Sequence, residues 1–235
     1  KIPFEGVMAK VWNRRMFQHI KRQADDASVK LAHERGACPD AADYNIMERF
    51  SNKMAIAPTA SISIICGGAS PGIEPIAANA YTHKTLSGSF PVRNKCLEAL
   101  LEKKGQNTED VWSSIFTNEG SVQHLEFLDQ NEKDVFKTAF EIDQRWLIEH
   151  AGDRAPFVCQ AQSLNVFLPA NVHKKELHNI HFEAWKKGVK SLYYCRSKSI
   201  QRAESHASWQ RAKGAEPVQE QLAEANNYEE CLACQ

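Results

Sequence analysis

Two cysteines near the end of the chain, Cys231 and Cys234, are separated by two residues within a polar segment. A disulfide between them would close a small ring at a terminus, where it would stabilise little. A dithiol in this place is suited to exchanging electrons with another site, so the pair predicts redox delivery. Half of a zinc site is the alternative, but structural zinc takes four ligands and His206 lies at no recognisable finger spacing.

A second candidate site is the segment Pro58-Thr59-Ala60-Ser61-Ile62-Ser63, where hydroxyl groups coincide with the expected start of a helix. Helix N-termini expose unpaired amide donors and a partial positive charge, so a phosphate could bind here without a lysine. The alternative is that a hydroxyl caps its own helix, which is the more frequent arrangement for such residues.

The adjacent Tyr193 and Tyr194 form the third candidate. Neighbouring tyrosines could relay an electron together with a proton if their rings are in contact. Consecutive side chains of a strand point to opposite faces, so ring contact requires a departure from regular pleating. The alternative is that both rings fill a core strand.

Composition excludes several classes of protein. The chain has 235 residues, 43% of them hydrophobic, which is enough for one large domain or two modest ones. Lysine plus arginine and aspartate plus glutamate number 29 each, so no net charge recruits nucleic acid or an anionic membrane. We expect neither partner, and we expect a cytoplasmic protein because neither a signal peptide nor a run of about 20 apolar residues is present. Seven scattered cysteines suit a reducing compartment, and we expect the five outside the terminal pair to be ordinary buried thiols.

Apolar residues at three- and four-residue intervals predict an amphipathic helix over residues 7–31 that ends near Gly36. Residues 67–75 are rich in glycine and proline and predict an irregular elbow. Four polar helices are expected at the periphery of the fold. They cover residues 94–104, 109–116, 132–140 and 144–149.

The second half of the chain has a βαβ pattern. Residues 163–167 predict a strand, 173–187 a helix that stops at Gly188, and 190–194 a second strand. Two strands joined by such a helix predict a parallel pair with a right-handed crossover, and thus an α/β fold. Residues 200–235 lose their hydrophobic residues and predict a flexible tail.

Six segments follow one another in a pattern that goes beyond these elements. They are Ala57-Pro58-Thr59-Ala60-Ser61-Ile62-Ser63, Gly72-Ile73-Glu74-Pro75, Tyr81-Thr82-His83-Lys84-Thr85-Leu86-Ser87-Gly88, Gln162-Ser163-Leu164-Asn165, Gly188-Val189-Lys190-Ser191-Leu192-Tyr193-Tyr194 and the terminal cysteine pair. Together they resemble the C-terminal part of the large (α) subunit of class I ribonucleotide reductase. The resemblance implies a ribonucleoside-diphosphate reductase that makes deoxyribonucleotides by radical chemistry. It also implies that residues 1–199 form the last portion of a ten-stranded α/β barrel with peripheral helices, and that residues 200–235 form the redox-active tail.

The resemblance assigns roles to residues. The loop that holds the substrate phosphates corresponds to Thr59, Ala60, Ser61 and Ile62. Many members carry threonine or serine at the position of Ile62. Because isoleucine has no hydroxyl group, we expect Ile62 to contribute only its backbone amide. The radical-transfer pair corresponds to Tyr193 and Tyr194. The pair that re-reduces the active-site disulfide corresponds to Cys231 and Cys234.

The resemblance also implies partners. They are a small (β) subunit with a dinuclear metal and radical cofactor, thioredoxin or glutaredoxin, and a ribonucleoside diphosphate. We expect no cofactor and no metal site in this chain itself. None of the other five cysteines matches the family's radical-forming cysteine, and the chain begins with lysine, so we expect a natural or constructed C-terminal fragment that needs the N-terminal part and is inactive alone. A non-catalytic remnant that acts as an association module, and a thiol oxidoreductase that uses only the tail, are the alternatives.

Overall fold

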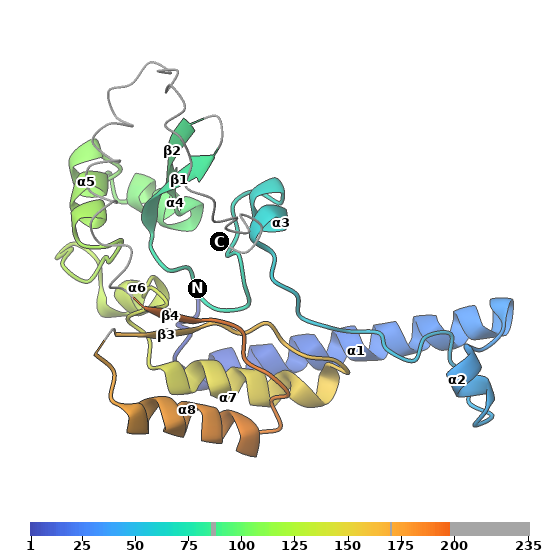
Figure 1. The fold of residues 1–235 in the computed structure, drawn as a ribbon. Coiled ribbons are helices and arrows are strands. Elements are labelled where there is room, and N and C mark those ends of the chain that lie inside the picture. Colours follow the sequence, from blue (N-terminus) through green and yellow to red (C-terminus); the bar gives the residue numbers. More distant parts are fainter. Residues whose placement is uncertain (86–87, 170, 198–235) are drawn as a thin grey trace, which may run out of the picture.

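A computed structural model describes residues 1–85, 88–169 and 171–197 as a mixed arrangement of helices and short strands (Figure 1). The helices are α1 (Val7–Arg35), α2 (Pro39–Ala42), α3 (Ala60–Ile65), α4 (Lys95–Lys103), α5 (Glu109–Thr117), α6 (Gln130–Val135), α7 (Gln144–Arg154), the short 3-10 helix η1 (Ala155–Phe157) and α8 (Lys174–Lys186). The strands are β1 (Ala80–Thr85), β2 (Gly88–Arg93), β3 (Val166–Leu168) and β4 (Cys195–Ser197). The predicted tail, residues 200–235, lies outside the described residues.

The predicted βαβ unit is confirmed as β3–α8–β4. The two strands are parallel, with Val166 opposite Cys195 and Leu168 opposite Ser197. The backbone N–H of Lys175 donates to Nδ1 of His173 at the start of α8 (3.1 Å), and Gly188 follows the helix with a φ of 71°, a left-handed conformation that glycine adopts without strain. The predicted strand over residues 190–194 is wrong in position, because regular pairing begins only at Cys195.

The sheets are small in the part of the chain that the structure describes. β1 and β2 form an antiparallel pair, β3 and β4 form the parallel pair, and an isolated parallel bridge joins Ile56 to Gln162. These segments do not close a barrel within the described residues.

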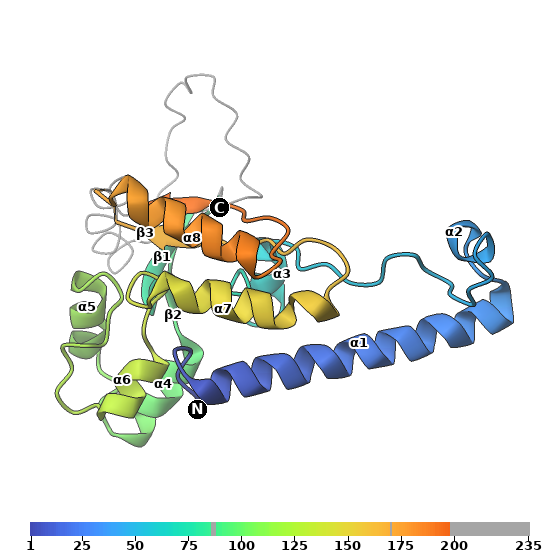
Figure 2. The same ribbon diagram turned by 90° about the horizontal axis from the view of Figure 1, so that it is seen from below.

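Three of the four helices predicted to be peripheral, α4, α5 and α7, instead bury one face in the interior, whereas α6 has no buried residue. One cluster of buried side chains includes Leu97 and Leu101 of α4 with Trp112 and Ile115 of α5, all fully buried. The second cluster surrounds α7, which packs between α1 and α8 (Figure 2). For these three helices the prediction was wrong because a few apolar residues at helical spacing bury one face, however polar the rest of the helix is.

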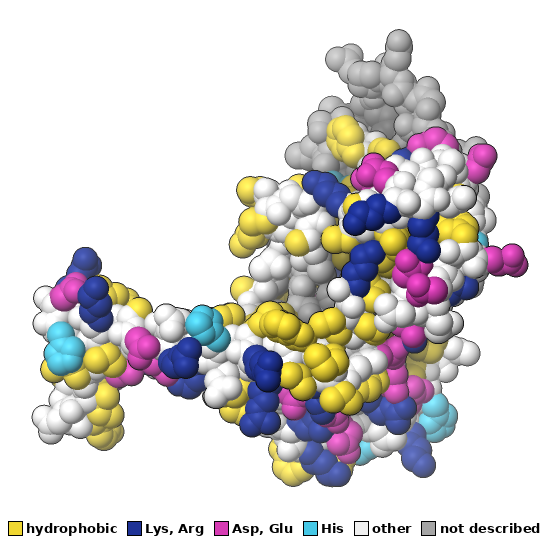
Figure 3. All heavy atoms as spheres, turned by 180° about the vertical axis from the view of Figure 1, so that it is seen from behind, with side chains coloured by type: hydrophobic (Ala, Val, Ile, Leu, Met, Phe, Trp, Pro, Cys, Tyr) yellow, Lys and Arg dark blue, Asp and Glu magenta, His cyan; other side chains and the backbone are white. Residues whose placement is uncertain are grey.

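The helix predicted over residues 7–31 is confirmed as α1, which ends where Gly36 N donates to Ala32 O (2.8 Å). Part of its apolar face is uncovered in the described part of the chain. Val7, Trp12 and Ile20 are 73%, 48% and 46% exposed, and the far end of α1 extends with α2 away from the other elements. We call the far end of α1 together with α2 the arm. Figure 3 shows hydrophobic side chains on the surface where this arm meets the rest of the described structure. None of the described helices is both long enough and apolar enough to cross a membrane.

A capping box holds the start of α6. Oδ1 of Asp129 accepts from Glu132 N (2.8 Å), and Oε2 of Glu132 accepts from Asp129 N (3.0 Å). We expect Asp129→Ala to lower the free energy of unfolding by about 1 kcal/mol, measured by denaturant titration, because the Glu132 amide loses its acceptor. Asp129→Asn keeps an acceptor and serves as the control, so an equal loss in both variants would contradict the capping explanation.

Candidate functional site

The segment predicted to bind phosphate forms a turn followed by α3. Both the backbone N and the Oγ1 of Thr59 donate to the carbonyl oxygen of Pro71, at 3.1 and 3.0 Å. The Thr59 side chain therefore makes no cap on α3, and the self-capping alternative does not describe this turn. The amides at the start of a helix have no intrahelical acceptor, so the turn presents donors beside the exposed side chains of Ser61 and Ile62.

The elbow that follows α3 is irregular, as predicted. Gly67 and Gly68 have φ values of 96° and 80°, which β-carbon-bearing residues rarely adopt. Further along, the Ser70 hydroxyl donates to Glu74 O (2.7 Å). The elbow thereby carries the chain from Pro71, which holds Thr59, to a buried glutamate.

Glu74 was not predicted as a site residue, yet it joins two of the sequence motifs. Its side chain is almost fully buried (5% exposed), and its Oε1 accepts a hydrogen bond from Asn165 Nδ2. Burial raises the pKa of Glu74, while the bond from Asn165 and the charge of Arg196 act in the opposite direction. Both residues lie in short motifs of the sequence, Glu74 in Gly72-Ile73-Glu74-Pro75 and Asn165 in Gln162-Ser163-Leu164-Asn165. The sequence alone does not show that these two motifs are in contact.

The rings of Tyr193 and Tyr194 are in contact, with centroids 4.1 Å apart and planes at 53°. Regular pleating would separate them, and this segment precedes the strand. Two backbone bonds of 2.8 Å hold it: Tyr193 N donates to Leu164 O, and Val166 N donates to Tyr194 O. The rings are 37% and 42% exposed, so the core-filling alternative does not apply.

Two arginines contact the segments around the tyrosine pair, Arg196 at the Tyr194 ring and Arg154 at Gln162. The guanidinium of Arg196 lies 5.5 Å from the centre of the Tyr194 ring. Arg154 is buried, and its Nε donates to Gln162 Oε1 (2.6 Å), which ties α7 to the Gln162–Asn165 motif. Burial lowers the pKa of Arg154 to about 10, with the carboxyl groups of Glu74 and Asp153 acting in the opposite direction. Arg154 therefore stays cationic at neutral pH.

The five other cysteines are not buried thiols as expected. Four of them are exposed, and Cys38 is half-buried. Cys159 receives the backbone N–H groups of Lys53 and Met54 on its sulfur, at 3.1 and 3.0 Å. Burial by itself raises the pKa of this thiol, but the backbone hydrogen bonds outweigh it and the pKa is lowered.

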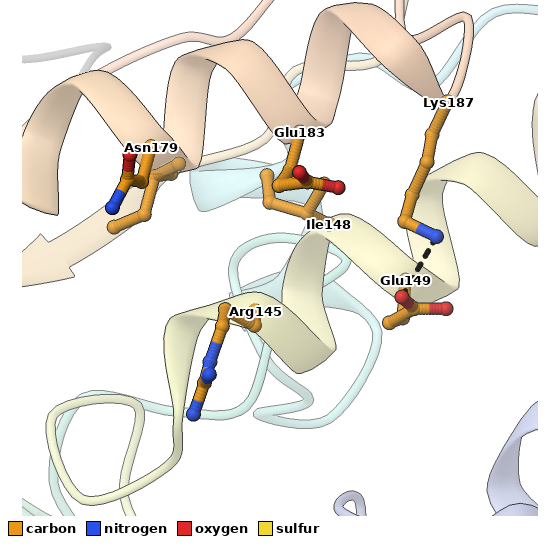
Figure 4. A pocket seen from close by; sticks show the side chains of 7 residues that line it. Arg145, Ile148, Glu149, Asn179, Glu183 and Lys187 are labelled. Carbon is orange, nitrogen blue, oxygen red and sulfur yellow. Dashed lines mark ion pairs between the residues drawn. The ribbon is translucent and has the colours of Figure 1, made fainter.

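A separate groove of about 430 Å³ lies between α7 and α8 (Figure 4). Charges of both signs line it, and Lys187 pairs there with Glu149 at 2.7 Å. None of its lining residues is a predicted site residue.

Comparison with known proteins identifies the fold to which this site belongs. Residues 41–195 match the family described as ribonucleotide reductase, barrel domain. The chain belongs to the ribonucleotide reductase barrel family. It is 45% identical over 211 residues to the ribonucleoside-diphosphate reductase large subunit of Invertebrate iridescent virus 6, covering 88% of this chain and 22% of that protein. It is 42% identical over 202 residues to the large subunit of Invertebrate iridescent virus 3, covering 85% of this chain and 32% of that one.

A solved structure is similar as well. The Actinobacillus ureae class Id ribonucleotide reductase alpha subunit superposes with a TM-score of 0.77 at 36% identity, covering 84% of this chain and 36% of that one. This ribonucleotide reductase barrel chain therefore spans between about one fifth and two fifths of the length of these relatives.

Within this ribonucleotide reductase segment, contacts join two of the three predicted sites. Thr59 bonds to Pro71, Glu74 follows on the same elbow, and Glu74 bonds to Asn165. Asn165 in turn lies between the two residues whose backbones hold Tyr193 and Tyr194. The third predicted site, Cys231 and Cys234, lies outside the described residues.

Proposed function

We propose that this chain is the C-terminal part of the large subunit of a ribonucleoside-diphosphate reductase, which reduces ribonucleotides to deoxyribonucleotides for DNA synthesis. The observation that carries the proposal is the contact of the Tyr193 and Tyr194 rings at 4.1 Å, outside a regular strand and half-exposed. The two rings are tilted against each other, and a relay of an electron and a proton requires such contact.

The turn at Thr59 is assigned to the diphosphate of the substrate. Amides at the start of α3 supply donors for the phosphate oxygens, and Ser61 adds an exposed hydroxyl. Thr59 and Ala60 shape the turn, since both donor groups of Thr59 are occupied by Pro71 O. Ile62 has an exposed apolar side chain and contributes its backbone only.

The tyrosine pair is assigned to radical transfer from a small (β) subunit. Each tyrosine loses one electron and its phenolic proton and regains both when the radical returns. The exposed fraction of both rings is consistent with a relay that begins at a subunit surface. A dinuclear metal and radical cofactor in the small subunit would supply the oxidising equivalent.

The remainder of the barrel is assigned to the N-terminal part of the large subunit. The described strands account for only part of a ten-stranded α/β barrel. The exposed apolar residues of α1, including Trp12 and Ile20, suit a face that other barrel segments cover. Residues 1–199 thus serve as the last portion of the barrel, and residues 200–235 serve as the tail.

The terminal dithiol is assigned to re-reduction of the active site. Reduction of each ribose consumes two thiols and leaves a disulfide. Cys231 and Cys234 pass two electrons and two protons to that disulfide, become a disulfide themselves, and are reduced by thioredoxin or glutaredoxin.

Co-expression tests the proposal. We expect the chain to reduce a ribonucleoside diphosphate when it is combined with an N-terminal large-subunit segment and a small subunit, and to show no reduction alone. The matched control omits only the N-terminal segment. A chain that unfolds cooperatively as a monomer and does not bind that segment would contradict the proposal.

A further inference from the structure

We propose that Glu74 is a positioning residue for the tyrosine pair: it is a neutral carboxylic acid that forms two hydrogen bonds with the Asn165 side-chain amide. This acid–amide pair holds the elbow behind Thr59 against the segment that carries Tyr193 and Tyr194. The consequence for turnover rests on the proposed function, whereas the acid–amide pair itself does not.

The first argument is a pair of buried acceptors. One hydrogen bond is present, from Asn165 Nδ2 to Glu74 Oε1. Glu74 Oε2 and Asn165 Oδ1 are both buried and have no hydrogen-bond partner. An ionised carboxylate and an amide oxygen can only accept, so two orphaned acceptors on two bonded side chains are costly. A proton on Oε2 turns that oxygen into a donor, and Asn165 Oδ1 becomes its acceptor.

The second argument is the electrostatic environment. Burial disfavours the ionised form of Glu74 and raises its pKa. The charged groups that act on it are Arg196 on β4 and Arg154 on α7, and both favour ionisation. The effect of burial is larger than the opposing effects taken together, which are the Asn165 side-chain bond, the backbone hydrogen bonds of Glu74 and Asn165, and the charge of Arg196. The neutral form is therefore favoured in the fold compared with the unfolded chain.

The third argument is the way in which the elbow places the carboxyl group. A β-carbon at Gly72 would lie 2.8 Å from Glu74 Oε1 and 2.9 Å from Oε2. The carboxyl group thus lies directly over Gly72, and only a residue without a side chain leaves it room. The preceding residue is Pro71, whose carbonyl oxygen accepts both bonds from Thr59.

The fourth argument is the place of Asn165. It stands between Leu164, which accepts from Tyr193 N, and Val166, which donates to Tyr194 O. A shift of Asn165 therefore moves both backbone bonds that hold the tyrosine segment. The acid–amide pair thus connects two segments: the elbow that includes Pro71, which accepts from Thr59, and the segment around Asn165, which bonds to the tyrosine backbone.

Measurement of stability against pH tests the pair in the full chain. An acid whose pKa is raised by folding stabilises the fold most below its unfolded pKa of 4.5, and this stabilisation is lost as pH rises through the folded pKa. Glu74→Gln places an amide donor and a carbonyl acceptor where the acid has its O–H and C=O. We expect the wild type to lose stability relative to Glu74→Gln above pH 4.5, and infrared spectra to show a protonated carboxyl band that persists above this pH and is absent in the variant.

A parallel dependence of both proteins on pH, with no such band, would overturn the inference whatever the activity. Gly72→Ala is the matched second variant, because its new methyl group pushes the carboxyl group off Asn165 while Glu74 remains. The band should shift or disappear in Gly72→Ala, and an unchanged band would also overturn the inference.

Turnover of the assembled reductase tests the positioning role. We expect Glu74→Gln to keep its kcat and to lose the decline in kcat that the wild type shows as Glu74 ionises at higher pH. Glu74→Leu fills a similar volume without hydrogen bonds, and we expect about a tenfold loss or more in kcat with little change in KM, because the contacts of Thr59 remain. Full turnover by Glu74→Leu would refute the positioning role, and absence of turnover in the wild type would refute the proposed function while the infrared result stays readable.

Discussion

Tyr194→Phe is expected to abolish nucleotide reduction by the assembled enzyme, with a loss of at least about 1000-fold in kcat, or about 4 kcal/mol in the activation barrier. Phenylalanine fills nearly the same volume beside Tyr193 and can still contact Arg196 through its ring. It has no phenolic proton to release, so the relay stops at this position. The measurement is the steady-state rate of deoxyribonucleotide formation, together with the dissociation constant of the substrate, which we expect to be unchanged.

Tyr44→Phe is the matched control for this experiment. Tyr44 is 78% exposed and lies beyond α2 at the far end of the arm, away from the Tyr193–Tyr194 contact. Removal of its hydroxyl should leave the rate unchanged. Retention of turnover in Tyr194→Phe would exclude radical transfer through this residue.

Replacement of both terminal cysteines, Cys231→Ser with Cys234→Ser, is expected to block repeated turnover with thioredoxin. The reason is chemical: a serine pair cannot accept or deliver the two electrons that reduce a disulfide. A first turnover should remain, because the active-site thiols begin reduced. A small dithiol that reaches the active site directly should restore cycling in part.

Cys66→Ser with Cys96→Ser provides the control for thiol number, since both of these cysteines are exposed. It should cycle normally. A thioredoxin-driven rate in the terminal double variant equal to that of the wild type would remove the shuttle role and leave the zinc alternative to be tested by metal titration.

Local periodicity predicted the helices well because a helix depends on neighbours within a few residues. α1 ends at Gly36 as predicted, and α8 fills the predicted crossover between parallel strands. The same reasoning placed α4 and α5 at the periphery, where the structure instead buries Leu97 and Trp112. Periodicity identifies which face of a helix is apolar, but the identity of its packing partner depends on segments far along the chain.

The candidate residues also differ in whether local sequence reveals them. The turn at Thr59 and the tyrosine pair were recognisable as short motifs, because their chemistry needs particular groups in adjacent positions. Glu74 and Arg154 were not, because their importance comes from burial and from partners 91 and 8 residues away. The sequence does not show that the Glu74 carboxyl group is buried, because its burial depends on how the chain folds.

The sequence by itself determined the family, the parallel βαβ unit and the residue types that suit phosphate, radical and thiol chemistry. The tertiary structure decided that Thr59 bonds to Pro71 instead of capping α3, that the tyrosine rings touch ahead of β4, and that Glu74 meets Asn165. The physical reason is range. Side-chain chemistry and helix periodicity are properties of nearby residues, whereas burial, ring contact and the pairing of distant polar groups exist only after the backbone has brought remote segments together.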